Sequence, residues 1–189
     1  MSAILGLFGC GLLCLAALAT AARLRRFPIR VRIAVMLGAA LAVFAPLGDL
    51  SIAALVRGIT GDLSVTTLVL AGAACVAQLS GKTVISPRDL RALSWLVVPG
   101  AAFLYPFALG WTPFDPYALG YGSVGFVSAL LLVTLAAWHL RCNVVVLIVI
   151  AAALAYLAGA YESRNLWDYL IDPVASVYAF VGLLAAALD

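Results

Sequence analysis

The sequence predicts an all-α fold, a polytopic transmembrane helical bundle of about seven spans. Of the 189 residues, 66% are hydrophobic and only 10% are charged, whereas soluble domains carry roughly 25% charged residues. The apolar runs are long and rich in Ala and Leu, unlike the alternating segments of about ten residues that form membrane barrels. We therefore expect residues 1–189 to form a single integral membrane domain, with no room for a separate soluble domain.

Seven apolar segments, separated by charged or turn-forming residues, are expected to cross the membrane, because a span needs about 20 apolar residues. The last segment would reach only about 24 Å as a helix, which is short of a hydrocarbon core of about 30 Å. The expected spans lie at about 3–22, 31–47, 63–79, 87–110, 123–140, 144–160 and 173–188.

Basic residues give the orientation of these spans. Nine of the eleven lie in the loops of one side, and only Arg57 and Arg164 lie on the other. Loops rich in Lys and Arg stay in the cytoplasm. The first apolar segment is followed, not preceded, by its basic cluster, which indicates a retained span and not a cleaved signal peptide. We expect a multi-pass protein of the bacterial cell inner membrane, with the N-terminus outside and the C-terminus in the cytoplasm.

Several polar residues match the signals that begin helices. Gly-Asp-Leu-Ser occurs twice, and Asp49 and Asp62 are predicted to be N-caps of a short interfacial helix at 50–57 and of the span at 63–79. Ser86 and Pro87, with Asp89 three residues after the serine, resemble a capping box with proline at the first helical position. These residues are therefore expected to be structural.

The most charged external segment is 161–173, which holds three carboxylates, an arginine and three large aromatics. Asn165 is predicted to cap a short helix at 166–171, and Asp172 to cap the helix that starts at Pro173. Asp115, in another external loop, precedes a proline and favours a turn. Two basic and six acidic residues give the external side a formal charge of −4.

The gathering of acids and aromatics on one side makes this face the candidate binding surface. Trp and Tyr also concentrate at membrane interfaces without any binding role. Carboxylates that share a partly desolvated site raise one another's pKa, or hold a cation or a partner's basic group. The candidate binding residues are Glu162, Arg164, Asp168, Asp172, Trp167, Tyr169, Asp115 and Trp111.

No set of catalytic residues emerges from the sequence. Ser123 and the single histidine, His139, are sixteen residues apart on one predicted helix, which separates them by roughly 24 Å, and a nucleophile and its base must be within hydrogen-bond reach. The sequence shows no glycine-rich phosphate loop and no zinc-ligand spacing. We therefore expect no catalytic residues, no metal and no cofactor, and we lean towards a protein that is not an enzyme.

The leading hypothesis is a non-enzymatic binding or accessory subunit of the inner membrane. Its acidic, aromatic periplasmic face would dock another membrane or periplasmic protein, a second copy of the chain, or an envelope lipid or glycan. Membrane lipid is an expected partner and nucleic acid is not, because the basic residues follow span ends. One alternative is a small transporter or channel with an acidic external mouth. The other is a membrane enzyme that acts on a lipid-linked substrate through external carboxylates.

Overall fold

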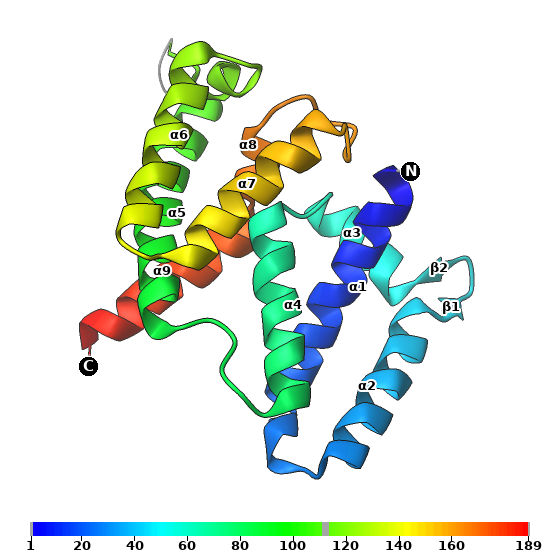
Figure 1. Cartoon of the computed structure of the whole chain (residues 1–189). Helices are drawn as coiled ribbons and strands as arrows, with labels where there is room; N and C mark the ends of the chain where they lie inside the picture. The colour runs from blue at the N-terminus through cyan, green and yellow to red at the C-terminus, as the bar shows by residue number, and fades with distance from the viewer. Residues whose placement is uncertain (1, 111–113, 189) are drawn as a thin grey trace. The chain divides into compact units, whose positions relative to one another are not determined.

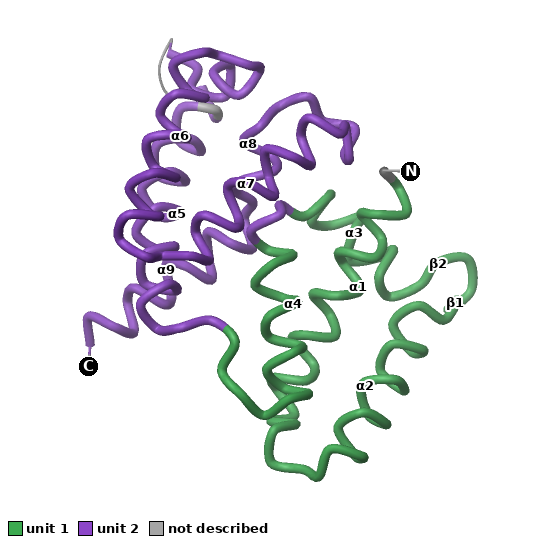
Figure 2. Tube along the Cα trace, viewed as in Figure 1, with its two compact units in different colours: residues 1–63, 67–84 green, residues 64–66, 85–189 purple. Residues whose placement is uncertain are grey.

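The described part of the protein, residues 2–110 and 114–188 of a computed structural model, is almost entirely helical (Figure 1). Within these residues the chain forms nine α-helices, two 3-10 segments and one two-stranded hairpin. The prediction of an all-α fold is confirmed. The chain divides into two compact units (Figure 2), unit 1 with Met1–Leu63 and Thr67–Val84, and unit 2 with Ser64–Thr66 and Ile85–Asp189. The prediction of a single membrane domain stays a prediction.

Unit 1 is a helical assembly in which α1 packs against α2 and α3. Its core includes Ala16 of α1 and Ala71 and Cys75 of α4. Small residues permit close approach here: a Cβ at Gly11 would overlap the ring of Phe44. The elements are α1 (Ser2–Ala21), η1 (Leu24–Arg26), α2 (Ile29–Phe44), β1 (Pro46–Leu47), β2 (Leu50–Ser51), α3 (Ile52–Thr60) and α4 (Val65–Ser80), the last entering unit 1 at Thr67.

Neither predicted aspartate cap of unit 1 forms. Asp49 lies in the turn of the β1–β2 hairpin, after Gly48, whose φ is 73°. The cap of α3 is instead Ser51, whose hydroxyl accepts a hydrogen bond from the Ala54 N–H at 3.2 Å. Asp62 lies three residues before the start of α4 and forms an ion pair with Arg57. The two Gly-Asp-Leu-Ser copies therefore adopt different structures.

Unit 2 contains the remaining helices, with α9 packed along α5, and α7 in contact with α5, α6 and α8. The predicted N-cap is confirmed, since the Ser86 hydroxyl accepts from the Asp89 N–H at 3.0 Å and Pro87 begins the helix. The Asp89 carboxylate accepts from the Ser86 hydroxyl and not from the Ser86 N–H, so the full capping box does not form. The elements are α5 (Pro87–Ala108), η2 (Pro116–Gly120), α6 (Val124–His139), α7 (Asn143–Leu157), α8 (Trp167–Leu170) and α9 (Pro173–Leu188).

Two helices in the described residues are long and apolar enough to cross a membrane, α1 over Ala3–Ala21 and α5 over Pro87–Phe107. The core helix of a soluble protein or a signal sequence has the same length and composition. Only 33% and 28% of the residues in their most apolar windows are buried, however, which is low for a soluble core. The apolar helices α4, α6, α7 and α9 have 15 or 16 residues each.

Candidate functional site

The segment 161–173 folds back onto η2 within unit 2, and Asp168 is central to that contact. Its Oδ2 accepts hydrogen bonds from the Tyr117 hydroxyl at 2.8 Å and from the Ser163 hydroxyl at 2.5 Å. Burial, followed by the hydrogen bond to Asp168 and the charge of that carboxylate, raises the pKa of Tyr117. Through these two neutral hydroxyl donors, Asp168 thus connects the 161–173 segment to η2, which lies far away in the sequence.

The side-chain amide of Asn165 also connects the 161–173 segment to η2 by hydrogen bonds. The side chain is fully buried; its Nδ2 donates to the Tyr117 carbonyl at 2.8 Å, and its Oδ1 accepts from the Trp167 N–H at 3.0 Å. A Cβ at Gly120 would overlap the Asn165 amide, so only glycine fits at this position. The predicted short helix at 166–171 forms as α8, over Trp167–Leu170. The prediction that Asn165 caps it is wrong, because Leu166 occupies the N-cap position and makes no side-chain cap bond.

The aromatic side chains of this segment are buried. The Trp167 indole N–H donates to the Pro116 carbonyl at 3.0 Å, and its ring lies 4.4 Å from that of Phe126. The Tyr169 ring stacks on Tyr161 at a centroid distance of 4.7 Å, and its hydroxyl accepts from the Tyr161 N–H at 3.1 Å. Trp167 and Tyr169 therefore anchor the segment, and their part in binding stays a prediction.

Asp172 ends the segment as a buried helix cap, as the sequence predicts. Its Oδ1 accepts from the Ala175 N–H at 2.6 Å in the first turn of α9. Its Oδ2 accepts from the Ser64 N–H at 2.7 Å. The second bond was not foreseen, because nothing in the sequence indicates that a residue beside α4 contacts position 172.

The other candidate binding residues have more exposed positions. Asp115 is exposed, and its carboxylate accepts from the Tyr117 N–H at 2.9 Å, which confirms the predicted turn. Glu162 and Arg164 are exposed in the segment itself. Tyr117 brings Asp115 and Asp168 together, since its N–H binds one and its hydroxyl binds the other. Trp111 lies outside the described residues.

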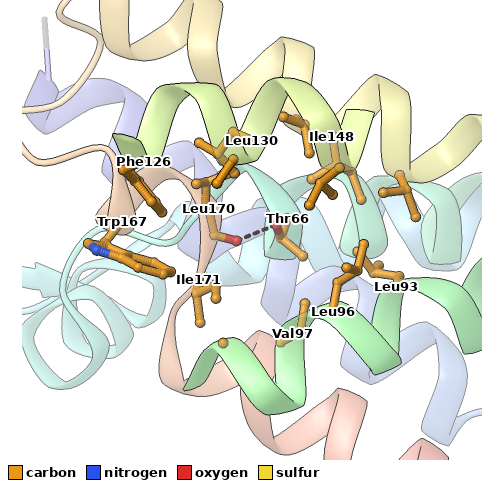
Figure 3. Close-up of a pocket in the computed structure, with 15 residues that line it drawn as sticks. Thr66, Leu93, Leu96, Val97, Phe126, Leu130, Ile148, Trp167, Leu170 and Ile171 are labelled. Carbon is orange, nitrogen blue, oxygen red and sulfur yellow. Dashed lines mark hydrogen bonds between the residues drawn. The ribbon is translucent and has the colours of Figure 1, made fainter. Parts of the chain in front are cut away.

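An apolar cavity of about 210 Å³ lies under this segment (Figure 3). The hydroxyl of Thr66 donates to the Leu170 carbonyl at 2.5 Å, so that both polar groups are paired within the wall. Side chains of α5, α6 and α7 complete the lining. The larger apolar side chains around the cavity include Phe126, Leu130, Ile148, Trp167, Leu170 and Ile171.

Sequence reasoning missed both the cavity and the partners of Asp168. Most of the cavity residues are Leu, Val and Ile, which are common in the apolar helices of this chain. Tyr117 and Ser163 carried no distinguishing signal, although their hydroxyls define the environment of Asp168. Across residues 2–110 and 114–188, no group of three or more His, Cys, Asp or Glu side chains is placed to hold a metal ion.

The geometry supplies a polar segment beside an apolar cavity. The buried carboxylate of Asp172 and the partly buried one of Asp168 bind the backbone and neighbouring hydroxyls, and the carboxylates of Asp115 and Glu162 are exposed. Comparison of the chain with protein-family models, with curated proteins and with solved structures finds no match.

Proposed function

We propose that the chain is a multi-pass protein of the bacterial inner membrane, with seven crossing helices, the N-terminus outside and the C-terminus in the cytoplasm. Its crossing helices would be α1, α2, α4, α5, α6, α7 and α9. Large apolar side chains are exposed on these helices, for example Leu41, Leu132 and Leu154. Soluble monomers rarely expose apolar patches of more than a few hundred Å², and lipid tails would cover these side chains.

In that membrane, the protein would serve as a binding or accessory subunit whose external face binds an envelope lipid or a lipid-linked partner. The observation that carries this proposal is the apolar cavity directly beneath the most charged external segment. Trp167, Leu170 and Ile171 belong to both features. An occupant could therefore place a hydrocarbon portion in the cavity and a polar portion near the exposed charges.

The cavity favours hydrocarbon because the polar groups at its wall already have partners. The Trp167 N–H binds Pro116, and the Thr66 hydroxyl binds Leu170. A polar group brought inside would lose its hydrogen bonds to water without replacing them, a cost of roughly 2–7 kcal/mol. A dry cavity of about 150 Å³ is enough to bind benzene, so a cavity of about 210 Å³ has room for part of one chain.

The exposed carboxylates of the two loops favour a basic portion on the occupant. The carboxylates of Asp115 and Glu162 lie at the surface, and Arg164 is the basic residue of the segment. Complementary charge selects partners and speeds their encounter. An amine-bearing lipid head group, or a basic patch on a lipid-linked protein, would match this surface.

The test is to purify the full chain from its native host in mild detergent and to identify bound lipid by mass spectrometry. Ala129 lines the cavity and Ala136 is exposed elsewhere on the same helix. We expect Ala129→Phe to remove the bound lipid and Ala136→Phe to retain it. Thermal unfolding measurements should show that both variants are folded. Equal lipid retention in the two variants, or no bound lipid in the unaltered protein, would contradict the proposal.

A further inference from the structure

We infer that unit 2 has a second binding site, for an anionic phospholipid, at the N-terminal end of α5. This inference rests on the proposed membrane location but not on the apolar cavity. Two adjoining surface pockets share Arg91 and Trp95. The first, of about 350 Å³, also has Arg88 in its lining, and the second, of about 530 Å³, extends along apolar residues of α5 and α9.

The first pocket has the positive charge that a phosphate group needs. The Arg88 guanidinium donates to the Leu140 carbonyl at 2.6 Å, which holds it at the pocket. Arg91 is exposed, and its side chain has no hydrogen bond or ion pair to any described residue. Arginine matches phosphate oxygens well, because its planar fork of N–H donors binds two oxygens at once.

The neighbouring acid does not neutralise these arginines by direct pairing. Asp89 Oδ2 accepts from the Ser86 hydroxyl at 2.6 Å, and Asp89 Oδ1 accepts from the Val144 N–H at 3.4 Å. Its carboxylate is thus used to cap α5 and to meet the start of α7. The formal charge of Arg88, Asp89 and Arg91 together is +1, and both cations remain directed to the pocket.

The second pocket supplies the surface for an acyl chain. Arg88, Arg91 and Trp95 follow one another at intervals of three and four residues, which places them on one face of α5. Trp95 is 64% exposed, and its ring would lie between the charged and apolar parts. Beyond it the wall consists of apolar side chains, among them Val98, Phe180, Leu183 and Leu184.

A cationic end joined to an apolar groove matches an amphiphile with an anionic head. Free phosphate would use the arginines but leave the groove uncovered. The site lies on the side that the basic loops assign to the cytoplasm, and basic pockets on that face bind anionic head groups. The charge and the apolar wall together therefore select a phospholipid.

The experiment compares retention of phosphatidylglycerol and phosphatidylcholine by the purified full chain in native mass spectrometry. We expect phosphatidylglycerol to be preferred, and the double variant Arg88→Gln/Arg91→Gln to weaken its binding about 25-fold, or about fivefold for each arginine. The matched control is Arg26→Gln/Arg30→Gln, which removes two exposed arginines of unit 1. It should leave the preference unchanged.

A second variant tests the groove. Ala187 lines the apolar pocket, and Ala187→Trp should fill it and reduce phosphatidylglycerol binding without removing charge. Equal retention of the two lipids, no effect of the arginine substitutions, or complete displacement by millimolar inorganic phosphate would overturn the inference. Ala129 lines the apolar cavity and neither of these two pockets, so Ala129→Phe should leave phosphatidylglycerol binding at this site unchanged. The experiments on the two sites can therefore fail independently of each other.

Discussion

Unit 1 and unit 2 both contain carboxylates that are predicted to lie on the external side, but these carboxylates have different partners in the two units. In unit 1, Asp62 Oδ1 forms an ion pair with Arg57 Nε at 2.8 Å, with side-chain exposures of 21% and 30%. In unit 2, Asp172 is buried and accepts from two backbone N–H groups. A partly exposed ion pair contributes little to stability. A buried carboxylate that receives neutral N–H groups fixes the backbone around it.

In unit 2, such bonds connect segments that are far apart in the sequence. The Ser64–Asp172 hydrogen bond joins residues 108 positions apart, and Asp168 and Asn165 bind a second distant loop. The carboxylates of Asp168 and Asp172 therefore stabilise one backbone arrangement of the 161–173 segment. The proposed binding surface requires that arrangement, because a loose segment would fill or expose the cavity.

The largest expected effect follows from removal of the Asp172 carboxylate. Asp172→Ala deprives the Ser64 and Ala175 N–H groups of their acceptor, and we expect the free energy of unfolding to fall by about 3 kcal/mol. The measurement is SDS titration of the purified protein in mixed micelles. Asp62→Ala in unit 1 is the matched control and should lower that free energy by less than about 1 kcal/mol. Equal losses would contradict the comparison.

Next in size is the effect of a methyl group at Gly120. Gly120→Ala would force its Cβ against the Asn165 amide, and overpacking of this kind lowers stability by about 1–3 kcal/mol. We expect a loss of about 2 kcal/mol and faster proteolysis of the 161–173 segment. Gly125 is helical, and the nearest side-chain atom to an added Cβ, Ser123 Oγ, would lie 3.8 Å away. Gly125→Ala should therefore be neutral, and a similar loss in both variants would show that Gly120 has no special role.

The all-α class was predictable from the long apolar segments, and some helix starts were predictable because they have a local signal. The Ser86 N-cap and the Asp172–Pro173 start depend on residues within one turn, and both formed. Asp49 and Asp62 show the limit of this reasoning. Their shared Gly-Asp-Leu-Ser sequence fits a cap, but Ser51 took that role in one copy and Arg57 bound the aspartate in the other.

For the candidate site, the sequence indicated a segment but not the contacts of that segment. Charge and aromatic content singled out 161–173, yet the partners of Asp168 and Asp172 come from distant loops. Trp167 and Tyr169 have the composition of an interfacial belt, although both side chains are buried. No local sequence pattern distinguishes an interfacial aromatic side chain from a buried one, because burial depends on which distant segment packs against residues 161–173.

A smaller effect is expected from the hydroxyl of Tyr117, which donates to Asp168. Tyr117→Phe should lower the free energy of unfolding by about 1.5 kcal/mol at neutral pH. Because folding raises the pKa of Tyr117, the folded state keeps the phenol proton where the unfolded chain loses it. This contribution is present below the usual tyrosine pKa of about 10 and declines as the pH rises above it. Unfolding measured from pH 8 to pH 11 should show a steeper decline for the unaltered protein than for Tyr117→Phe, and parallel curves would contradict the assignment.

The smallest expected effect tests the ion pair of unit 1. Arg57→Gln should lower the free energy of unfolding by about 0.5 kcal/mol at low ionic strength, since the pair is partly exposed. At 1 M salt the Debye length is only about 3 Å, so most of that difference should disappear. The loss caused by Asp172→Ala should change little with salt, because its carboxylate is buried and accepts from the neutral N–H groups of Ser64 and Ala175. SDS titrations of both variants at two salt concentrations measure this contrast. A salt-dependent loss at Asp172, or a salt-independent loss of several kcal/mol at Arg57, would show that the two units do not stabilise their carboxylates in different ways.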